Sequence, residues 1–161
     1  MSKQIILFYS FEGSTKMVAQ YLSKELNIPC EEIKPIKDLK SKGFSKYLLG
    51  SGEVIMKKKP HLHSIKSNLD EYDTIFIGSP IWAGSFTPAI RTLLETGILK
   101  DKNIAFFYTS LGGPGKAESK IKDSVKINNK LLSSYGLVNV KNEFEGVKAG
   151  VLEWAKSLEN K

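Results

Sequence analysis

Three hydroxyl side chains surround one glycine in the stretch Ser10-Phe-Glu-Gly-Ser-Thr15. Ser10, Ser14 and Thr15 can each donate a hydrogen bond, and Gly13 lets the backbone turn sharply or approach a ligand closely. The stretch joins an apolar run to a helical pattern, so it falls where the first N–H groups of a helix have no internal partner. This combination predicts a site for an anion such as a phosphate group. The alternative is an ordinary strand-to-helix turn in which Ser14 and Thr15 cap the helix.

Two later stretches suit a flat ligand. Residues 79–87 contain Trp82 among small residues, and an indole in such a loop is expected to be exposed and able to stack on a planar group. The alternative is that Trp82 folds back onto the helix that begins at Pro88. Residues 109–115 contain three glycines, whose amides can approach a ring edge without a side-chain clash. The three stretches together predict a ligand that is both planar and phosphorylated.

The apolar pattern predicts the elements that position these stretches. Strands are expected at residues 3–9, 30–36, 73–79, 103–109 and 137–143, and helices at residues 16–26, 88–95, 117–135 and 147–158. Residues 37–72 are expected to add one broken helix or two short ones. Continuous apolar runs of this kind are typical of strands that are buried on both faces of a parallel sheet.

This alternation predicts one α/β domain over residues 1–161, with the layers of an αβα sandwich around a doubly wound, five-stranded parallel sheet. Ligands of such sheets bind beyond the carboxyl ends of the strands, which is where the stretches 10–15, 79–87 and 109–115 fall.

The net charge of +7 is concentrated in one segment. Residues 34–66 contain nine lysines and two acidic residues, which is the whole excess. Such a segment is either a solvated surface or a docking patch for an acidic protein or an anionic cosubstrate. The sequence has no aromatic-interleaved basic strand and no recognition-helix pattern, so nucleic acid is not an expected partner.

The cysteine content and the hydropathy of the sequence indicate where in the cell the protein is expected. Cys30 is the only cysteine, so no internal disulfide can form and a reducing, cytoplasmic location is expected. No apolar run approaches the roughly 20 residues that span a bilayer, and the first strand begins almost at once. We therefore expect neither a membrane span nor a signal peptide.

Common nucleotide and metal motifs are absent. The run ending in Lys116 resembles the end of a P-loop, but Ser110 replaces its first glycine and Ala117 replaces its Ser or Thr. Residues 10–15 contain a single glycine, so the dinucleotide fingerprint is missing. His61 and His63 make a poor metal site. No pair of side chains suits acid–base catalysis, so neither catalytic nor metal residues are expected.

The stretches Ser10-Phe-Glu-Gly-Ser-Thr15, Gly78-Ser-Pro-Ile-Trp-Ala-Gly84 and Ser110-Leu-Gly-Gly113 together resemble the FMN-binding loops of flavodoxins of the short-chain type. The similarity in layout covers essentially the whole chain. It implies the strand order 2-1-3-4-5, for which flavodoxin itself is a standard example.

The resemblance also implies FMN as cofactor and a set of residues that bind it. Residues 10–15 would hold the phosphate, Trp82 would cover or edge the isoalloxazine ring, and residues 109–113 would flank its pyrimidine side. Gly84 would offer its carbonyl to N5–H of the reduced flavin. The expected binding residues are Ser10, Phe11, Glu12, Gly13, Ser14, Thr15, Pro80, Ile81, Trp82, Ala83, Gly84, Thr109, Ser110, Leu111, Gly112 and Gly113.

Three departures from the family pattern concern the site. Glu12 stands where a threonine is usual and puts a carboxylate near the phosphate unless it points to solvent. Ser14 replaces a frequent asparagine, and Leu111 stands where a second stacking aromatic is common. The chain is also basic, whereas typical electron-carrier flavodoxins are acidic.

Three functions are consistent with this resemblance. The first is an FMN-binding electron-transfer protein that shuttles one or two electrons between redox partner proteins or small donors and acceptors. The second is an FMN-dependent NAD(P)H:quinone-type oxidoreductase. The third is a flavin-free signalling or scaffold domain on the same fold. In the first two, an acidic or anionic partner would dock on residues 34–66, with neither nucleic acid nor membrane involved.

Overall fold

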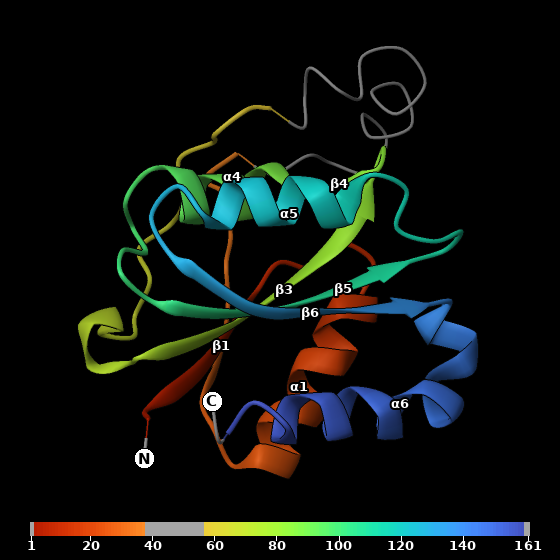
Figure 1. Cartoon of the computed structure of the whole chain (residues 1–161). Helices are drawn as coiled ribbons and strands as arrows, with labels where there is room; N and C mark the ends of the chain where they lie inside the picture. The colour runs from red at the N-terminus through yellow and green to blue at the C-terminus, as the bar shows by residue number, and fades with distance from the viewer. Residues whose placement is uncertain (1, 38–56, 160–161) are drawn as a thin grey trace.

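The structure is a computed structural model that describes residues 2–37 and 57–159 (Figure 1). Its strands are β1 (Gln4–Phe8), β2 (Cys30–Glu32), β3 (Thr74–Trp82), β4 (Ser85–Phe86), β5 (Asn103–Ser110) and β6 (Lys130–Val138). Its helices are α1 (Ser14–Leu26), α4 (Pro88–Glu95), α5 (Ala117–Val125) and α6 (Val140–Lys156), with a short 3-10 helix η1 (Leu69–Glu71).

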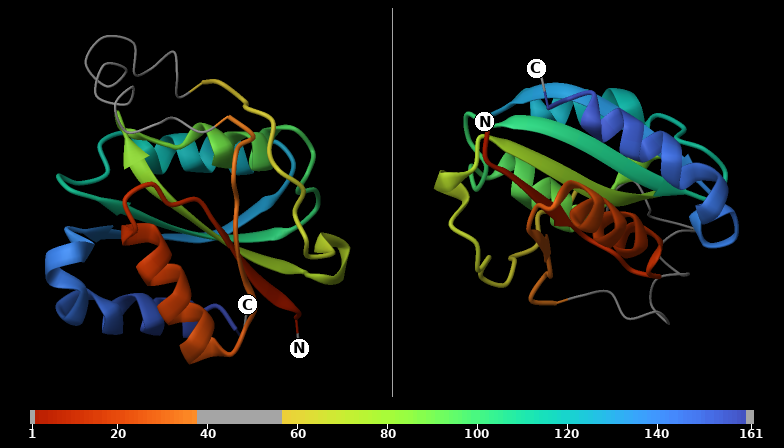
Figure 2. Two further views of the ribbon diagram at one scale, coloured as in Figure 1. Left: turned by 180° about the vertical axis from the view of Figure 1, so that it is seen from behind. Right: turned by 90° about the horizontal axis from the view of Figure 1, so that it is seen from below.

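Five parallel strands form the sheet in the order β2-β1-β3-β5-β6, and β4 pairs antiparallel with the end of β3. Helices α4 and α5 cover one face, and α1 and α6 cover the other (Figures 1 and 2). The predicted three-layer architecture and strand order are therefore confirmed. None of the helices in the described ranges combines the length and the apolar character that crossing a bilayer requires.

Each face of the sheet buries its own apolar cluster because side chains alternate along a strand. On β1, Ile5 and Leu7 pack with residues of α4 and α5, whereas Ile6 and Phe8 pack with residues of α1 and α6. All four side chains are buried. The central strands are consequently apolar on both faces, which explains their continuous apolar runs.

Two aromatic rings of β5 lie on glycines of the neighbouring strands. Gly78 of β3 pairs with Phe107, and a Cβ added to Gly78 would stand 2.4 Å from that ring. Gly136 of β6 pairs with Tyr108, and a Cβ there would stand 2.6 Å from that ring. Both glycines are therefore required for close approach rather than for a turn.

The last strand differs from the prediction. We expected a helix over residues 117–135 and a strand over 137–143, but α5 ends at Val125 and β6 covers Lys130–Val138. The side chain of Asn129 accepts a hydrogen bond from the Lys102 N–H at 3.0 Å and donates one to the Leu99 carbonyl at 3.0 Å. These bonds tie the turn between α5 and β6 to the loop that precedes β5. The apolar pair after Asn129 suited a helix equally well, so spacing alone placed this strand wrongly.

The second strand is shorter than expected. Strand β2 ends at Glu32, and residues 34–36 instead pair antiparallel with residues 61–63. The N–H of Ile36 donates to the His61 carbonyl at 2.9 Å, and the N–H of His63 donates to the Lys34 carbonyl at 2.8 Å. Pro35 lacks an N–H and faces Leu62 across this pair. The helices expected within residues 37–72, and three of the nine lysines, fall on positions 38–56, outside the described residues.

Candidate functional site

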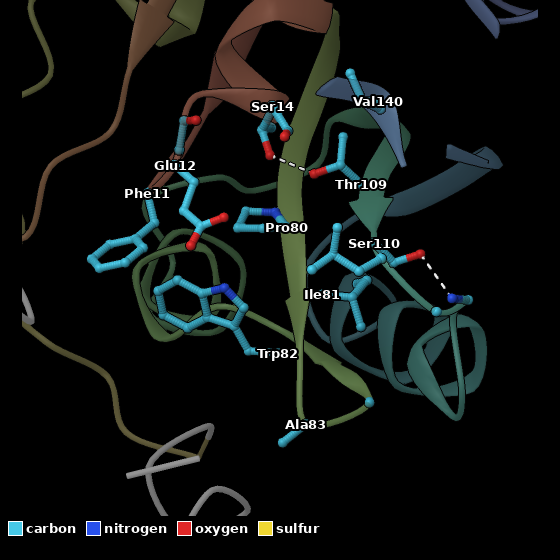
Figure 3. A pocket seen from close by; sticks show the side chains of 16 residues that line it. Phe11, Glu12, Ser14, Pro80, Ile81, Trp82, Ala83, Thr109, Ser110 and Val140 are labelled. Carbon is cyan, nitrogen blue, oxygen red and sulfur yellow. Dashed lines mark hydrogen bonds between the residues drawn. The ribbon is translucent and has the colours of Figure 1, made fainter. Parts of the chain in front are cut away.

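The carboxyl ends of β1, β3 and β5 surround a pocket with a volume of about 510 Å³ (Figure 3). It is lined by fifteen of the sixteen residues predicted from the sequence and by Val140. Gly13 is the predicted residue that does not line it. The structure therefore brings the three stretches together, while their role toward a cofactor stays a prediction.

Helix α1 begins at one end of this pocket. Its N-cap is Gly13, with a φ of 99° that side chains other than glycine rarely adopt. The expectation that Ser14 or Thr15 caps the helix is wrong, because both already lie within it and no side chain bonds from the cap position. The Ser10 hydroxyl caps this end of the helix instead. It accepts hydrogen bonds from the N–H groups of Gly13 and Lys16, both at 3.2 Å.

Several donors at this helix end have no acceptor within the described chain. The N–H groups of Ser14 and Thr15 and the Ser14 hydroxyl are in this position. The Thr15 hydroxyl is buried and bonds the Thr109 hydroxyl at 2.9 Å (Figure 3). Unpaired N–H groups at the positive end of a helix dipole attract an anion, so this end of the pocket suits a phosphate.

The stretch after β3 is a hairpin rather than the expected loop. Strand β3 continues to Trp82, and Ser85 and Phe86 fold back on it with the pairs Ile81↔Phe86 and Trp82↔Ser85. The two residues between them, Ala83 and Gly84, have φ angles of 48° and 68°. Two positive φ angles match a type I′ turn. An Ala-Gly pair is a weak signal for this turn, which is why the sequence did not reveal it.

Trp82 is packed rather than exposed. Its side chain is 9% exposed, and its ring meets those of Tyr9 and Phe11 edge-on, at centroid distances of 5.7 and 5.5 Å. The expectation of an exposed indole is therefore wrong. Trp82 still lines the pocket, so the same ring serves both the core and the cavity wall (Figure 3).

The loop after β5 forms the opposite wall. The Ser110 hydroxyl accepts a hydrogen bond from the Gly113 N–H at 3.2 Å, and the Ser110 carbonyl accepts one from the Asn139 N–H at 2.8 Å. The second bond brings the end of β6 to the pocket and places Val140 in its wall. Sequence reasoning missed Val140 because it put residues 137–143 inside a strand. Leu111, at the position where a second aromatic is common, is 81% exposed.

Glu12 contributes the acidic group of the pocket wall. Figure 3 shows its side chain extending into the pocket toward Pro80 and Trp82. The residue as a whole is exposed, so water screens its charge. A carboxylate in this position opposes an anionic ligand without blocking the donors of α1.

The pocket has the features of a binding site rather than those of a metal centre. One end offers hydrogen-bond donors, and the other offers apolar and aromatic side chains. Within residues 2–37 and 57–159, no group of three or more His, Cys, Asp or Glu side chains is placed to hold a metal ion. Such a site suits a ligand with an anionic end and a planar, apolar body.

Solved structures that are similar to this chain include flavoproteins and flavodoxins. A Lactobacillus acidophilus flavoprotein, crystallised in complex with FMN, is 25% identical, with a TM-score of 0.71 over 91% of this chain and 98% of the other. The apo form from the same organism, solved by NMR, is 25% identical, with a TM-score of 0.64 over 89% and 97%. A flavodoxin from the domain Archaea, 16% identical, has a TM-score of 0.54 over 96% and 97% and shows the fold alone.

Family membership rests on the sequence itself. No curated protein matches the chain. The family profile described as flavodoxin matches residues 3–151, which includes all three loops of the pocket. The resemblance predicted from those loops is thereby confirmed, and the chain belongs to the flavodoxin family.

Proposed function

We propose that this protein binds FMN in the pocket between α1 and the ends of β3 and β5, and that it transfers electrons. The observation that carries this proposal is the division of one pocket of about 510 Å³ into an anion-binding end and an apolar, aromatic body. The flavoprotein from Lactobacillus acidophilus, crystallised with FMN, supports the choice of ligand.

The residues present fit the two parts of FMN. The N–H groups of Ser14 and Thr15 and the Ser14 hydroxyl would hold the phosphate, since they have no acceptor in the described chain. Pro80, Trp82 and the backbone of residues 109–113 would hold the ring system, because they also line the pocket. A phosphate held by a helix end needs no metal ion and no lysine.

Bound FMN would supply the capacity to accept and release one or two electrons. The chain would supply position and environment. Trp82 would shield one side of the ligand from water, and the bond between Thr15 and Thr109 would hold the start of α1 near the third loop. No side chain of the pocket is paired for acid–base catalysis, which favours electron transfer over a reaction on a bound substrate.

The first test is a visible absorbance scan of the purified protein before and after addition of FMN, followed by stepwise anaerobic reduction. A yellow protein with one FMN per chain is expected. Reduction in two resolved one-electron steps would support an electron carrier, and a single two-electron step would favour a reductase. Failure to take up FMN would contradict the proposal and favour a flavin-free domain.

An FMN-dependent NAD(P)H:quinone-type oxidoreductase is the second candidate. The basic character of the chain favours it, because a phosphorylated donor is anionic. Oxidation of NAD(P)H by the FMN-loaded protein with a quinone acceptor tests this function. Absence of turnover with several acceptors would leave the carrier as the function.

The proposed setting is the cytoplasm, with an acidic or anionic partner on the lysines of residues 34–66. The single cysteine, Cys30, supports the setting, since no internal disulfide can form. Burial, followed by the nearby Glu32, raises the pKa of this thiol to about 11. Lys34 and Lys59 are each paired with a glutamate, so the remaining described lysines of the segment would meet the partner.

A further inference from the structure

A second cavity lies on the other side of the β3–β4 hairpin. Its volume is about 390 Å³, and its wall is made by β4, α4, Lys57, α5 and the residues on either side of α5. The side chains that matter for its chemistry are Lys57, Ser85, Arg91, Lys116 and Lys120. These residues come from four separate segments, so sequence spacing did not reveal the cavity.

The wall of this cavity is positively charged. Four cationic residues and two acidic residues, Glu95 and Asp123, line it, for a net charge of +2. Glu95 is already neutralised by Arg91, at 2.5 Å, and by Lys59, at 3.3 Å. Within the described chain, the ammonium groups of Lys57, Lys116 and Lys120 form no ion pair. The cavity therefore attracts anions.

A buried hydroxyl in the wall has no partner. Ser85 is fully buried, and its Oγ is the one buried side-chain N or O atom in the described chain without a hydrogen bond. Buried polar groups are normally paired, because leaving one unpaired destabilises the fold. A serine that keeps an unpaired hydroxyl beside a cationic cavity points to a ligand that accepts its hydrogen bond.

Arg91 is held rigidly at the same wall. Its guanidinium bonds Glu95 and lies 4.6 Å from the centre of the Phe86 ring. Glu95 in turn accepts a hydrogen bond from Ser124. This network positions the arginine before any ligand arrives, which lowers the entropy cost of binding.

The two cavities share one thin wall. Gly84 lines the first cavity and Ser85, the next residue, lines the second. The turn also packs against the start of α5, since a Cβ added to Gly84 would lie 3.6 Å from the backbone nitrogen of Lys116. The β3–β4 hairpin therefore separates a molecule bound in the second cavity from the pocket that we assign to FMN.

We propose that the second cavity binds the phosphate or diphosphate group of a small molecule, the second ligand of this protein. The inference deepens the proposed function, because a flavoprotein needs an electron donor or acceptor and this ligand would meet the flavin at the hairpin. Ser85 and the lysines would recognise the phosphate, beside the Arg91–Glu95 ion pair that forms part of the cavity wall.

Calorimetric titration of the FMN-loaded protein with inorganic pyrophosphate tests the proposal, since FMN then occupies the first phosphate site. One pyrophosphate per chain is expected. Lys120→Gln should weaken binding roughly tenfold, the loss of one charge-assisted hydrogen bond. Lys122→Gln is the matched control, because it makes the same charge change on α5 outside the cavity. FMN affinity should stay unchanged in both variants.

Absence of pyrophosphate binding, or equal weakening by Lys120→Gln and Lys122→Gln, would overturn the proposal. A protein that binds FMN but not pyrophosphate would refute this inference and leave the proposed function intact. If FMN does not bind, NMR of the FMN-free protein separates the sites. Pyrophosphate shifts at the amides of Ser85 and Ser124 would support the second cavity, and shifts confined to Gly13 and Ser14 would refute it.

Discussion

The hydroxyls of Thr15 and Thr109 bond each other at 2.9 Å, although 94 positions separate them in the chain. Both side chains are buried, and they connect the start of α1, which would hold the phosphate, to the end of β5, next to the loop that would flank the ring. Replacing one threonine by valine keeps the shape but leaves the other hydroxyl unpaired, which costs about 1–3 kcal/mol. We expect Thr15→Val and Thr109→Val each to lower the free energy of unfolding by this amount.

Urea denaturation of the two single variants and the double variant measures this coupling. The double variant should lose much less than the sum of the singles, because neither hydroxyl is then left unpaired. Strictly additive losses would show that the bond does not join the two loops in solution.

Trp82 is expected to affect both stability and FMN affinity. Trp82→Ala would remove a buried ring and cost about 3–5 kcal/mol, so loss of folding would obscure its effect on binding. Trp82→Phe keeps an aromatic ring against Tyr9 and Phe11 and should fold, with FMN bound several-fold more weakly and an altered visible spectrum.

Trp154→Phe is the control for this experiment. Trp154 lies on the opposite face of the sheet, where its indole N–H donates to the Ser133 hydroxyl at 3.0 Å. This variant should lose stability without losing FMN affinity. Equal FMN affinity in Trp82→Phe and the wild-type protein would restrict Trp82 to a packing role.

Removal of the Glu12 charge should strengthen FMN binding. Its carboxylate extends into the pocket toward Pro80 and Trp82, so its charge repels a ligand that carries a phosphate dianion. Glu12→Gln should lower the dissociation constant up to about tenfold at low salt, equivalent to about 1.4 kcal/mol. The gain should shrink as ionic strength rises, because Glu12 is exposed. Glu25→Gln, at the far end of α1, should change nothing. Weaker binding by Glu12→Gln would mean that the carboxylate accepts a hydrogen bond from the ligand.

Ser85 and Ser124 should respond oppositely to alanine. Ser85→Ala removes an unpaired buried hydroxyl and should raise the free energy of unfolding by about 1 kcal/mol. Ser124→Ala removes a bond to a charged carboxylate and should lower it by about 1.5–3 kcal/mol. Thermal or urea unfolding of the ligand-free protein measures both. Destabilisation by Ser85→Ala would show that its hydroxyl is paired in solution.

Glu95 should make stability depend on acid pH. Burial raises the pKa of this carboxyl, but the hydrogen bond from Ser124 and the charges of Arg91 and Lys59 outweigh burial and hold the pKa below its ordinary value of 4.5. A group with a lowered folded pKa stabilises the fold above its unfolded pKa, and this stabilisation is lost as pH falls through the folded value. Unfolding free energies of wild-type and Glu95→Gln proteins should therefore differ at neutral pH and converge below pH 4.5. A difference that persists in acid would indicate lost packing instead of lost charge.

The sequence predicted the central part of this site because its signals are local. The apolar runs locate β1, β3 and β5 along the chain, and parallel strands end at one edge of the sheet. Residues that follow these strands therefore lie close together, whichever contacts their side chains make.

Features that depend on tertiary contacts were not predictable in this way. Asn129, in the turn after α5, bonds residues 99 and 102, and no local sequence pattern indicates these contacts. Trp82 packs against Tyr9 and Phe11, which lie between β1 and α1, far from Trp82 in the sequence. The second cavity joins Lys57, Arg91 and Lys120 across the chain, so only the fold reveals their common charge.

The two glycines under the rings of Phe107 and Tyr108 set the alignment of the pocket walls. A slip of one residue between neighbouring strands would shift one wall by about 3.3 Å and would put each ring against a side chain in place of a glycine. Only one offset between β3, β5 and β6 is thus compatible with both rings. The loops of the site can therefore change in sequence, while Gly78 and Gly136 keep the strands that carry these loops in the same register.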